Sequence, residues 1–186
     1  MKRVVVLFSG KGTNLERLIE TLPAHGIAVV AAITNRPEAG GIERAKRRGV
    51  DVEVIDHTLF ESREAFDKVL VETIERYAPD LTVTAGFMRI LTPVFTERVR
   101  AINLHPSLLP KYKGARAIEQ AFASGDAICG VSVHWVSAEL DGGEVIAQAS
   151  FRRTPDMDFD AFEAKIHALE YRLLPETVVG VVKGEK

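Results

Sequence analysis

In the first hundred residues, short runs of apolar residues alternate with segments patterned like amphipathic helices. An apolar run without polar alternation is typical of a strand that is buried on both faces of a parallel sheet. Repeated strand–helix alternation predicts a doubly wound α/β fold, a Rossmann-like three-layer α/β/α arrangement on a mostly parallel, twisted sheet. The strands expected from these runs cover Arg3–Phe8, Ile27–Thr34, Val52–Ile55, Leu81–Ala85 and Ala101–Leu104.

The helices between and after these runs are marked by caps and by breakers. Thr13 or Asn14 is expected to cap the first helix, which ends near Leu22, and Pro175 is expected to kink the last one. The remaining helices are predicted over Gly41–Arg48, from Ser62 to the stop at Pro79, briefly after Pro93, over Ala115–Ser124 and over Asp158–Val182.

The second half of the chain has a different strand pattern. Val131–Val136 and Glu144–Ser150 alternate polar and apolar residues on either side of Leu140-Asp141-Gly142-Gly143, which is typical of a hairpin turn or short loop. We therefore expect an antiparallel portion of the sheet in the C-terminal half. Because 186 residues contain no repeat, linker or low-complexity segment, we expect one domain over residues 1–186.

Charge and cysteine content limit the functional classes. The chain carries 24 Lys and Arg against 26 Asp and Glu, so its charge gives no reason to expect nucleic-acid binding. Its one cysteine, Cys129, fits a reducing cytoplasm, and no apolar stretch approaches a signal peptide or a membrane span. The five histidines lack metal-ligand spacing, so no metal is expected. Small-molecule substrates are the expected partners, and monomer and homodimer both remain open.

A glycine-rich loop, Ser9-Gly10-Lys11-Gly12-Thr13-Asn14, follows the first predicted strand. Glycines at a helix start let a phosphate approach free backbone N–H groups. A dinucleotide fingerprint would need glycine at Leu15, and Lys11 is misplaced for an ATP-binding Walker loop. The loop indicates a small phosphomonoester site with Thr13 and Asn14 as donors; an ordinary tight turn is the alternative.

A second motif, Asn103-Leu104-His105-Pro106 and its continuation to Pro110, lies at the carboxyl end of a predicted strand, where open α/β sheets bind ligands. Alternation along the strand puts Asn103 and His105 on one face. An amide that stabilises an oxyanion beside an imidazole that moves protons suits acyl transfer. A structural histidine with a capping Asn is the alternative.

Asp141 is the third candidate. An Asp-Gly pair needs no function beyond its turn, but the carboxylate could also orient His105 and stabilise its imidazolium form. No Gly-x-Ser-x-Gly elbow is present, and Cys129 lies in apolar surroundings, which favours direct transfer without a covalent enzyme intermediate.

Four segments together resemble the phosphoribosylglycinamide formyltransferases of purine biosynthesis, a branch of the 10-formyltetrahydrofolate-dependent family. The resemblance covers nearly the whole chain, in order and at compatible spacings. The segments are Ser-Gly-Lys-Gly-Thr-Asn at 9–14, Ala-Gly-Phe-Met-Arg-Ile-Leu at 85–91, Asn-Leu-His-Pro-Ser-Leu-Leu-Pro at 103–110 and Glu-Leu-Asp-Gly-Gly at 139–143.

The resemblance implies transfer of a formyl group from 10-formyltetrahydrofolate to the amine of 5′-phosphoribosylglycinamide, without ATP or metal. It implies catalytic roles for Asn103, His105 and Asp141. The implied ribonucleotide-binding residues are Gly12, Thr13, Asn14 and Glu170. The implied folate-binding residues are Arg63, Met88, Arg89, Ile90, Leu91 and Asn103.

Two positions depart from the family pattern. Arg116 stands where many relatives have histidine, so we assign it no catalytic part. Tyr171 follows Glu170 at a position where histidine is frequent, which affects the detail of the ribose pocket but not the role of the carboxylate. Methionyl-tRNA formyltransferase would be expected to carry a C-terminal RNA-binding domain, and formyltetrahydrofolate hydrolase an N-terminal regulatory domain. A noncatalytic nucleotide-binding module could share the glycine-rich turn, but it would not need Asn103, His105 and Asp141 together.

Overall fold

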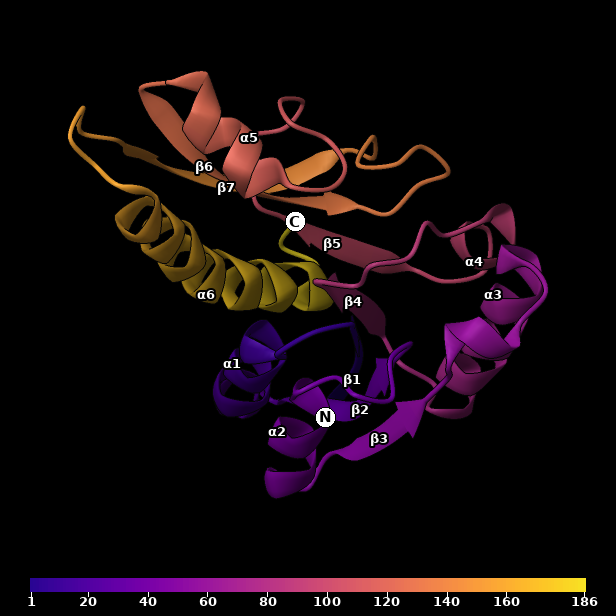
Figure 1. Ribbon diagram of the computed structural model, residues 1–186. Helices are drawn as coiled ribbons and strands as arrows, with labels where there is room; N and C mark the ends of the chain where they lie inside the picture. Colours follow the sequence, from indigo (N-terminus) through magenta and orange to yellow (C-terminus); the bar gives the residue numbers. More distant parts are fainter.

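Seven strands form one sheet with the spatial order β3-β2-β1-β4-β5-β6-β7 (Figure 1). The structure, a computed structural model, describes residues 1–186. Strands β1 to β5 pair in parallel, whereas β6 is antiparallel to both β5 and β7. The strands are β1 Lys2–Phe8, β2 Ile27–Thr34, β3 Asp51–Val54, β4 Leu81–Ala85, β5 Ala101–His105, β6 Ile128–Trp135 and β7 Val145–Arg152.

Helices cover both faces of this sheet. Helices α1, α2, α5 and α6 contribute to the core on one face, and α3 and α4 contribute to the core on the other. The helical segments are α1 Thr13–Thr21, η1 Leu22–His25, α2 Gly41–Arg47, η2 His57–Leu59, α3 Arg63–Arg76, α4 Pro93–Thr96, α5 Ala117–Ser124 and α6 Phe159–Lys183. The predicted three-layer, mostly parallel fold with an antiparallel C-terminal portion is confirmed.

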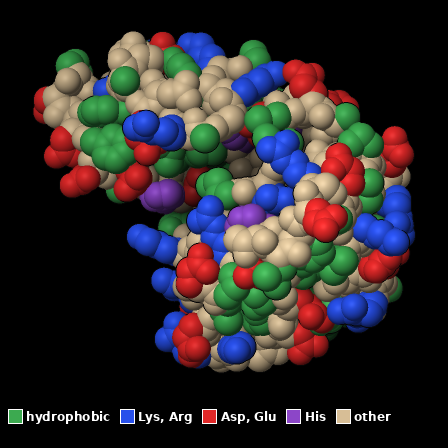
Figure 2. Space-filling view, turned by 45° about the vertical axis from the view of Figure 1, so that its right-hand side comes forward, with side chains coloured by type: hydrophobic (Ala, Val, Ile, Leu, Met, Phe, Trp, Pro, Cys, Tyr) green, Lys and Arg blue, Asp and Glu red, His purple; other side chains and the backbone are tan.

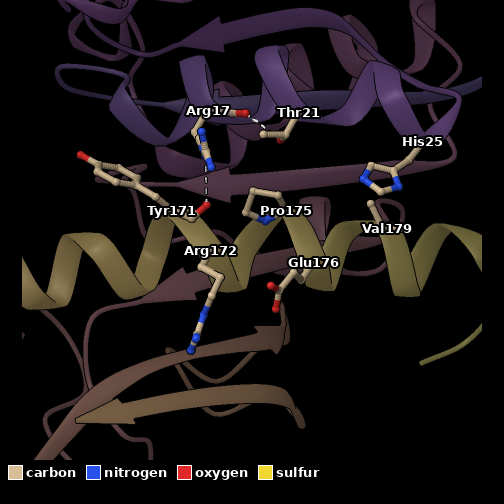
Figure 3. A pocket seen from close by; sticks show the side chains of 8 residues that line it. All are labelled: Arg17, Thr21, His25, Tyr171, Arg172, Pro175, Glu176 and Val179. Carbon is tan, nitrogen blue, oxygen red and sulfur yellow. Dashed lines mark hydrogen bonds between the residues drawn. The ribbon is translucent and has the colours of Figure 1, made fainter.

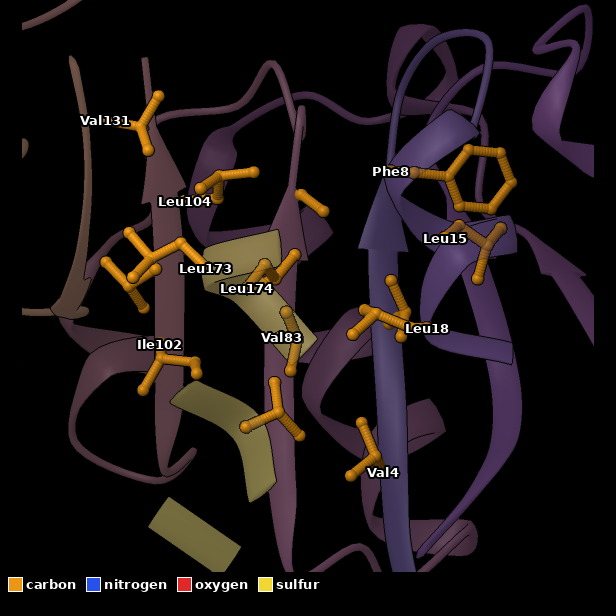
Figure 4. Close-up of a cluster of buried hydrophobic side chains, with 14 of the residues drawn as sticks. Val4, Phe8, Leu15, Leu18, Val83, Ile102, Leu104, Val131, Leu173 and Leu174 are labelled. Carbon is orange, nitrogen blue, oxygen red and sulfur yellow. The ribbon is translucent and has the colours of Figure 1, made fainter. Parts of the chain in front are cut away.

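Strand β1 shows how the pattern builds the two cores. Val4, Val6 and Phe8 enter the core beneath α1 and α6, and Val5 and Leu7 enter the core beneath α3, all with no exposed surface. Figure 4 shows Leu15 and Leu18 of α1 and Leu173 and Leu174 of α6 packed on the first of these faces. Each fully buried Val, Leu or Phe side chain contributes about 1.5–3 kcal/mol.

The strand positions were predicted better than the ends of the elements. β6 begins at Ile128 instead of Val131 and ends at Trp135, and β7 covers Val145–Arg152. Residues 136–144 connect them, so the predicted Asp-Gly hairpin turn is a longer loop. Helix α5 begins at Ala117, because Arg116 before it has a left-handed φ of 59° that ends regular helix geometry.

Helix α6 runs through Pro175, where the sequence predicts a kink. Proline has no N–H, so the carbonyl of Tyr171, four residues earlier, lacks its helical donor. Arg17 of α1 donates Nε–H to that carbonyl at 3.3 Å (Figure 3). A side chain from the neighbouring helix thus replaces the missing hydrogen bond.

Candidate active site at the carboxyl ends of the central strands

The loops that follow β1, β4 and β5 leave the same edge of the sheet. Strand order reverses between β1 and β4, and open α/β sheets bind ligands outside the carboxyl ends of their strands at such a point. Ser9 after β1 donates its N–H to Gly86 O after β4 at 2.9 Å, which joins two of these loops. Figure 2 shows a deeply hollowed face with histidine and Lys or Arg side chains around the hollow.

Asn103, His105 and Asp141 come together beside this edge. His105 Nδ1 lies 3.4 Å from Asp141 Oδ2, and Asn103 Nδ2 lies 3.4 Å from Asp141 Oδ1. His105 and Asp141 are 5% and 9% exposed, so water screens their interaction weakly. Asn103 and His105 extend from β5, and Asp141 comes from the loop between β6 and β7.

The backbone holds Asp141 in a constrained position. Its φ of 51° lies in the left-handed region, which Asp tolerates better than most residues. Gly114 donates its N–H to Asp141 Oδ2 at 2.7 Å. A Cβ on Gly143 would lie 1.7 Å from the carbonyl oxygen of Trp135, so only glycine fits at that position of the loop. The Leu-Asp-Gly-Gly sequence therefore meets a steric requirement as well as a chemical one.

Opposing effects act on the pKa of Asp141. Burial alone would raise it, but hydrogen bonding with His134, the Gly114 N–H and the charge of His105 outweigh burial and hold the pKa below its usual range. The carboxylate is therefore ionised at neutral pH and faces the His105 ring.

Both ring nitrogens of His105 face acceptors. Nε2 lies 2.7 Å from the carbonyl oxygen of Tyr112, so it carries a hydrogen and donates to that oxygen. Nδ1 faces the Asp141 carboxylate. The two contacts, one at each ring nitrogen, hold the His105 ring in one orientation between Tyr112 and Asp141.

The amide of Asn103 has a defined orientation. Its Oδ1 accepts the hydroxyl hydrogen of Thr84 at 2.6 Å, which turns Nδ2 toward His134 Nε2, at 3.1 Å, and Asp141. His134 Nε2 and Asp141 Oδ1 are themselves 3.5 Å apart, so Asn103, His134 and Asp141 form one polar cluster.

His134 also belongs to this cluster, although no motif in the sequence points to it. It lies opposite Asn103 in the antiparallel β5–β6 register and is 2% exposed. Its Nδ1 donates to its neighbour's carbonyl, Trp135 O, at 2.8 Å, which leaves Nε2 facing Asn103 and Asp141. Only the strand register could have revealed this position from sequence.

The glycine-rich loop is shaped by close backbone packing. Gly12 has a φ of 73°, and a Cβ there would lie 2.5 Å from Gly41 Cα. Gly12 is the N-cap of α1, and it makes no side-chain cap. The expectation that Thr13 or Asn14 caps this helix is therefore wrong, because both residues already lie within its first turn. The first N–H groups of α1 have no capping side chain, which is the arrangement that binds anions at helix starts.

Asn14 connects this loop to α6. Asn14 Nδ2 donates to Glu170 Oε2 at 3.1 Å, and His167 Nδ1 lies 3.0 Å from the same oxygen. Glu170 is 6% exposed. The structure thus brings together Asn14 and Glu170, two of the expected ribonucleotide-binding residues, and adds His167 to them.

The expected folate-binding residues lie on the loop after β4 and on α3. Met88 and Ile90 are exposed apolar side chains, and Met88 donates its N–H to the Ser9 hydroxyl at 2.7 Å. Arg63 is the exposed first residue of α3. Tyr171, one of the two departures from the family pattern, stacks on His167.

Three further observations concern the rest of the molecule. A groove of about 350 Å³ between α1 and α6, shown in Figure 3, is lined by Arg17, Tyr171 and six other residues, and it includes none of Asn103, His105 and Asp141. No three His, Cys, Asp or Glu side chains are grouped so that they could hold a metal ion. No helix combines the length and the apolar composition needed to cross a membrane.

Comparisons with known proteins agree on one family. The model of the formyl transferase family matches residues 2–178. Phosphoribosylglycinamide formyltransferase of Escherichia coli (strain K12) is 42% identical over 97% of this chain and 87% of that protein. The trifunctional purine biosynthetic protein adenosine-3 of Drosophila melanogaster is 40% identical over 98% of this chain, which spans 14% of that protein. The crystal structure of phosphoribosylglycinamide formyltransferase from Campylobacter jejuni superposes with a TM-score of 0.93 at 48% identity, covering 97% of each chain.

Proposed function

Since the chain belongs to the formyl transferase family, we propose that it moves a formyl group from 10-formyltetrahydrofolate to the amine of 5′-phosphoribosylglycinamide. The protein is a formyl-transferring enzyme of purine biosynthesis that acts on small substrates and uses a folate-derived donor. The observation that carries the specific reaction is the contact of Asn103 and His105 with one ionised carboxylate, Asp141, at the carboxyl ends of the strands.

The reaction begins with attack by the neutral glycinamide amine on the formyl carbon. Negative charge develops on the formyl oxygen as the carbon becomes tetrahedral. The side-chain amide of Asn103 and the protonated ring of His105 are the donors for this oxygen, and preorganised donors in a buried site stabilise such charge strongly. No covalent bond to the enzyme is required.

Collapse of the intermediate transfers a proton and breaks one bond. The attacking nitrogen loses a proton, N10 of the folate gains one through His105 or an ordered water, and the bond between the formyl carbon and N10 breaks. Formylglycinamide ribonucleotide and tetrahydrofolate are the products. Asp141 keeps its charge throughout and stabilises the imidazolium form of His105.

The His105 ring must lose its hydrogen bond to Tyr112 O before Nε2 can donate to a ligand. Its Nε2–H donates to Tyr112 O, and its Nδ1 faces Asp141. Substrate binding therefore requires the Tyr112 carbonyl to move away from Nε2. The loop that holds it has left-handed φ angles at Tyr112, Gly114 and Arg116, a conformation that non-glycine residues adopt at a cost.

The two substrates bind on either side of Asn103 and His105. The phosphate meets the uncapped N–H groups at the start of α1, with Gly12, Thr13 and Asn14 around it, and the ribose meets Glu170. The pterin ring binds the backbone of residues 88–91, and Arg63 faces the carboxylate tail of the folate. Local donors thus replace the basic surface that the net charge of −2 does not supply.

The remaining parts of the proposal concern conditions and assembly. Residues 1–186 act as one formyltransferase domain in the cytoplasm, as a monomer or a homodimer. The donor is already activated, so the reaction proceeds without ATP and without a metal.

One assay tests this function. The protein is incubated with 10-formyltetrahydrofolate, with and without the ribonucleotide, and tetrahydrofolate release is followed in the presence of a metal chelator. We expect release only when the amine is present. Release that is independent of the amine would indicate a hydrolase, and no release under either condition would indicate a binding module.

A further inference from the structure

The carboxylate of Asp67 lies fully buried in α3 and has no part in the reaction derived above. Its Oδ2 accepts two hydrogen bonds from one residue, Thr92: the backbone N–H at 2.7 Å and the side-chain hydroxyl at 2.7 Å. Thr92 is the N-cap of α4, but its hydroxyl makes no cap to that helix and its hydrogen bond goes to Asp67. The C-terminal end of segment 88–91 is therefore attached to α3.

The other end of the same segment is also attached. Met88 donates its N–H to the buried hydroxyl of Ser9, on the loop after β1. Segment 88–91 has no helix or strand hydrogen bonds of its own. Hydrogen bonds at both ends thus hold the segment in position relative to the rest of the site.

Arg89 adds a third contact between this segment and α3. Its guanidinium carbon lies 4.7 Å from the centroid of the Phe66 ring, which adjoins Asp67 on the helix. Arg89 Nε and Asp67 Oδ1 are both buried without a hydrogen-bond partner. Burial raises the pKa of Asp67, and the positive charge of Arg89 opposes that increase.

Arg63 lies four residues before Asp67 on α3, so both side chains occupy one face of the helix. Segment 88–91 and Arg63 are the two groups that the proposed function assigns to opposite ends of the folate. We infer that Asp67 is a positioning residue that sets the spacing between the ring-binding segment and the tail-binding cation. This inference rests on the proposed function.

The physical consequence is a coupling between the two ends of one ligand. When both binding groups are held at the correct separation, binding at one end makes binding at the other nearly intramolecular. Loss of the Asp67–Thr92 contacts removes the hydrogen bonds that attach the segment to α3 and leaves only the contact of Arg89 with Phe66. The tail then adds less to affinity, even though Arg63 itself is unchanged.

The test measures how much the folate tail contributes to binding. Dissociation constants are determined for 10-formyltetrahydrofolate and for 10-formyltetrahydropteroate, which lacks the glutamate tail, in the absence of the ribonucleotide. For the unaltered protein we expect the ratio of the two constants to be about tenfold, the range of a charge-assisted contact. Asp67→Ala should reduce that ratio at least threefold and leave ribonucleotide affinity unchanged.

Matched variants separate this role from general destabilisation. Asp67→Asn keeps an oxygen that accepts both Thr92 hydrogens, so it should restore most of the ratio. Ile74→Val removes a buried methylene near the end of α3, costs about 0.5–1.5 kcal/mol and should leave the ratio unchanged. If Asp67→Ala does not fold, Thr92→Val removes one of the two hydrogen bonds and should lower the ratio by a smaller factor.

The outcomes distinguish the inference from the function beneath it. One outcome is a ratio of the two dissociation constants that is about tenfold in the unaltered protein and stays the same in Asp67→Ala or Thr92→Val. That result overturns the positioning role of Asp67 and leaves the proposed function standing. A ratio near one in the unaltered protein, with no effect of Arg63→Ala, overturns the folate assignment itself. A reduced ratio in Asp67→Ala, restored in Asp67→Asn and normal in Ile74→Val, supports the positioning role.

Discussion

His105 Nδ1 lies 3.4 Å from Asp141 Oδ2, although one residue ends a central strand and the other belongs to a loop beyond the next strand. The carboxylate is held by the Gly114 N–H and by a left-handed backbone at Asp141. Nothing else in the molecule places an ionised group against the His105 ring at this distance. The reactivity of the proposed site therefore depends on the conformation of the loop between β6 and β7.

Replacing Asp141 with Asn removes the charge and preserves the side-chain shape. We expect the fold to be retained and turnover to fall about 10²-fold or more, because the imidazolium form of His105 loses its counter-charge. Steady-state kinetics from pH 6 to pH 8 measure the effect, with circular dichroism as the control for folding. Undiminished turnover across that range would exclude the orienting role.

The same carboxylate makes stability depend on acid pH. Its folded pKa lies below its unfolded value of about 3.9, so its contribution is present above that value and is lost as the pH falls through the folded pKa. Urea unfolding of the protein and of Asp141→Asn between pH 5 and pH 2 tests this. The difference in unfolding free energy between the unaltered protein and Asp141→Asn should change in that interval. A difference that stays constant would contradict the lowered pKa of Asp141.

Thr13→Ala tests the anion site at the start of α1. Thr13 is the first residue of that helix, whose N-terminus has no capping side chain. Loss of one hydrogen bond to a charged phosphate costs about 1.5–3 kcal/mol, so KM for the ribonucleotide should rise about tenfold or more with KM for the folate unchanged. An effect confined to the folate would show that the loop binds the other substrate.

His167 gives the protein a second pH dependence, near neutral pH. The hydrogen bond to Glu170 raises the pKa of His167 against the effect of burial. The stabilisation is therefore complete below the unfolded pKa of about 6.5 and is lost as the pH rises through the folded pKa. His167→Gln, which retains a donor without the titration, is the matched variant. Its stability deficit should shrink as the pH rises from 5.5 to 8.5, and a deficit that grows would reverse the assigned sign.

The sheet could be predicted from sequence because its signal is local. Strand β1 contains a continuous apolar run, and the burial of Val4 to Phe8 on two faces follows directly from that pattern. The N-cap at Gly12 was mispredicted because it depends on a close backbone contact with Gly41. The long loop between β6 and β7 was mispredicted because it depends on a close contact of Gly143 with Trp135 O, and no local pattern encodes either contact.

In the candidate site, too, local patterns could be predicted from the sequence and long-range contacts could not. Asn103 and His105 could be placed on one face from the period of a strand, but His134 entered only through the β5–β6 register. Likewise, no local pattern in the sequence assigns a role to Asp67, since its contact with Thr92 joins two distant segments. Long-range pairings decide which polar side chains become part of a site.

Transfer of an isotopic label tests the central claim most directly. The donor is 10-formyltetrahydrofolate carrying ¹³C in the formyl group, and carbon NMR follows the label with the ribonucleotide present. The account predicts that the label appears on the glycinamide nitrogen, with one tetrahydrofolate released for each product and no labelled formate. Label recovered as formate, whether or not the ribonucleotide is present, would contradict it.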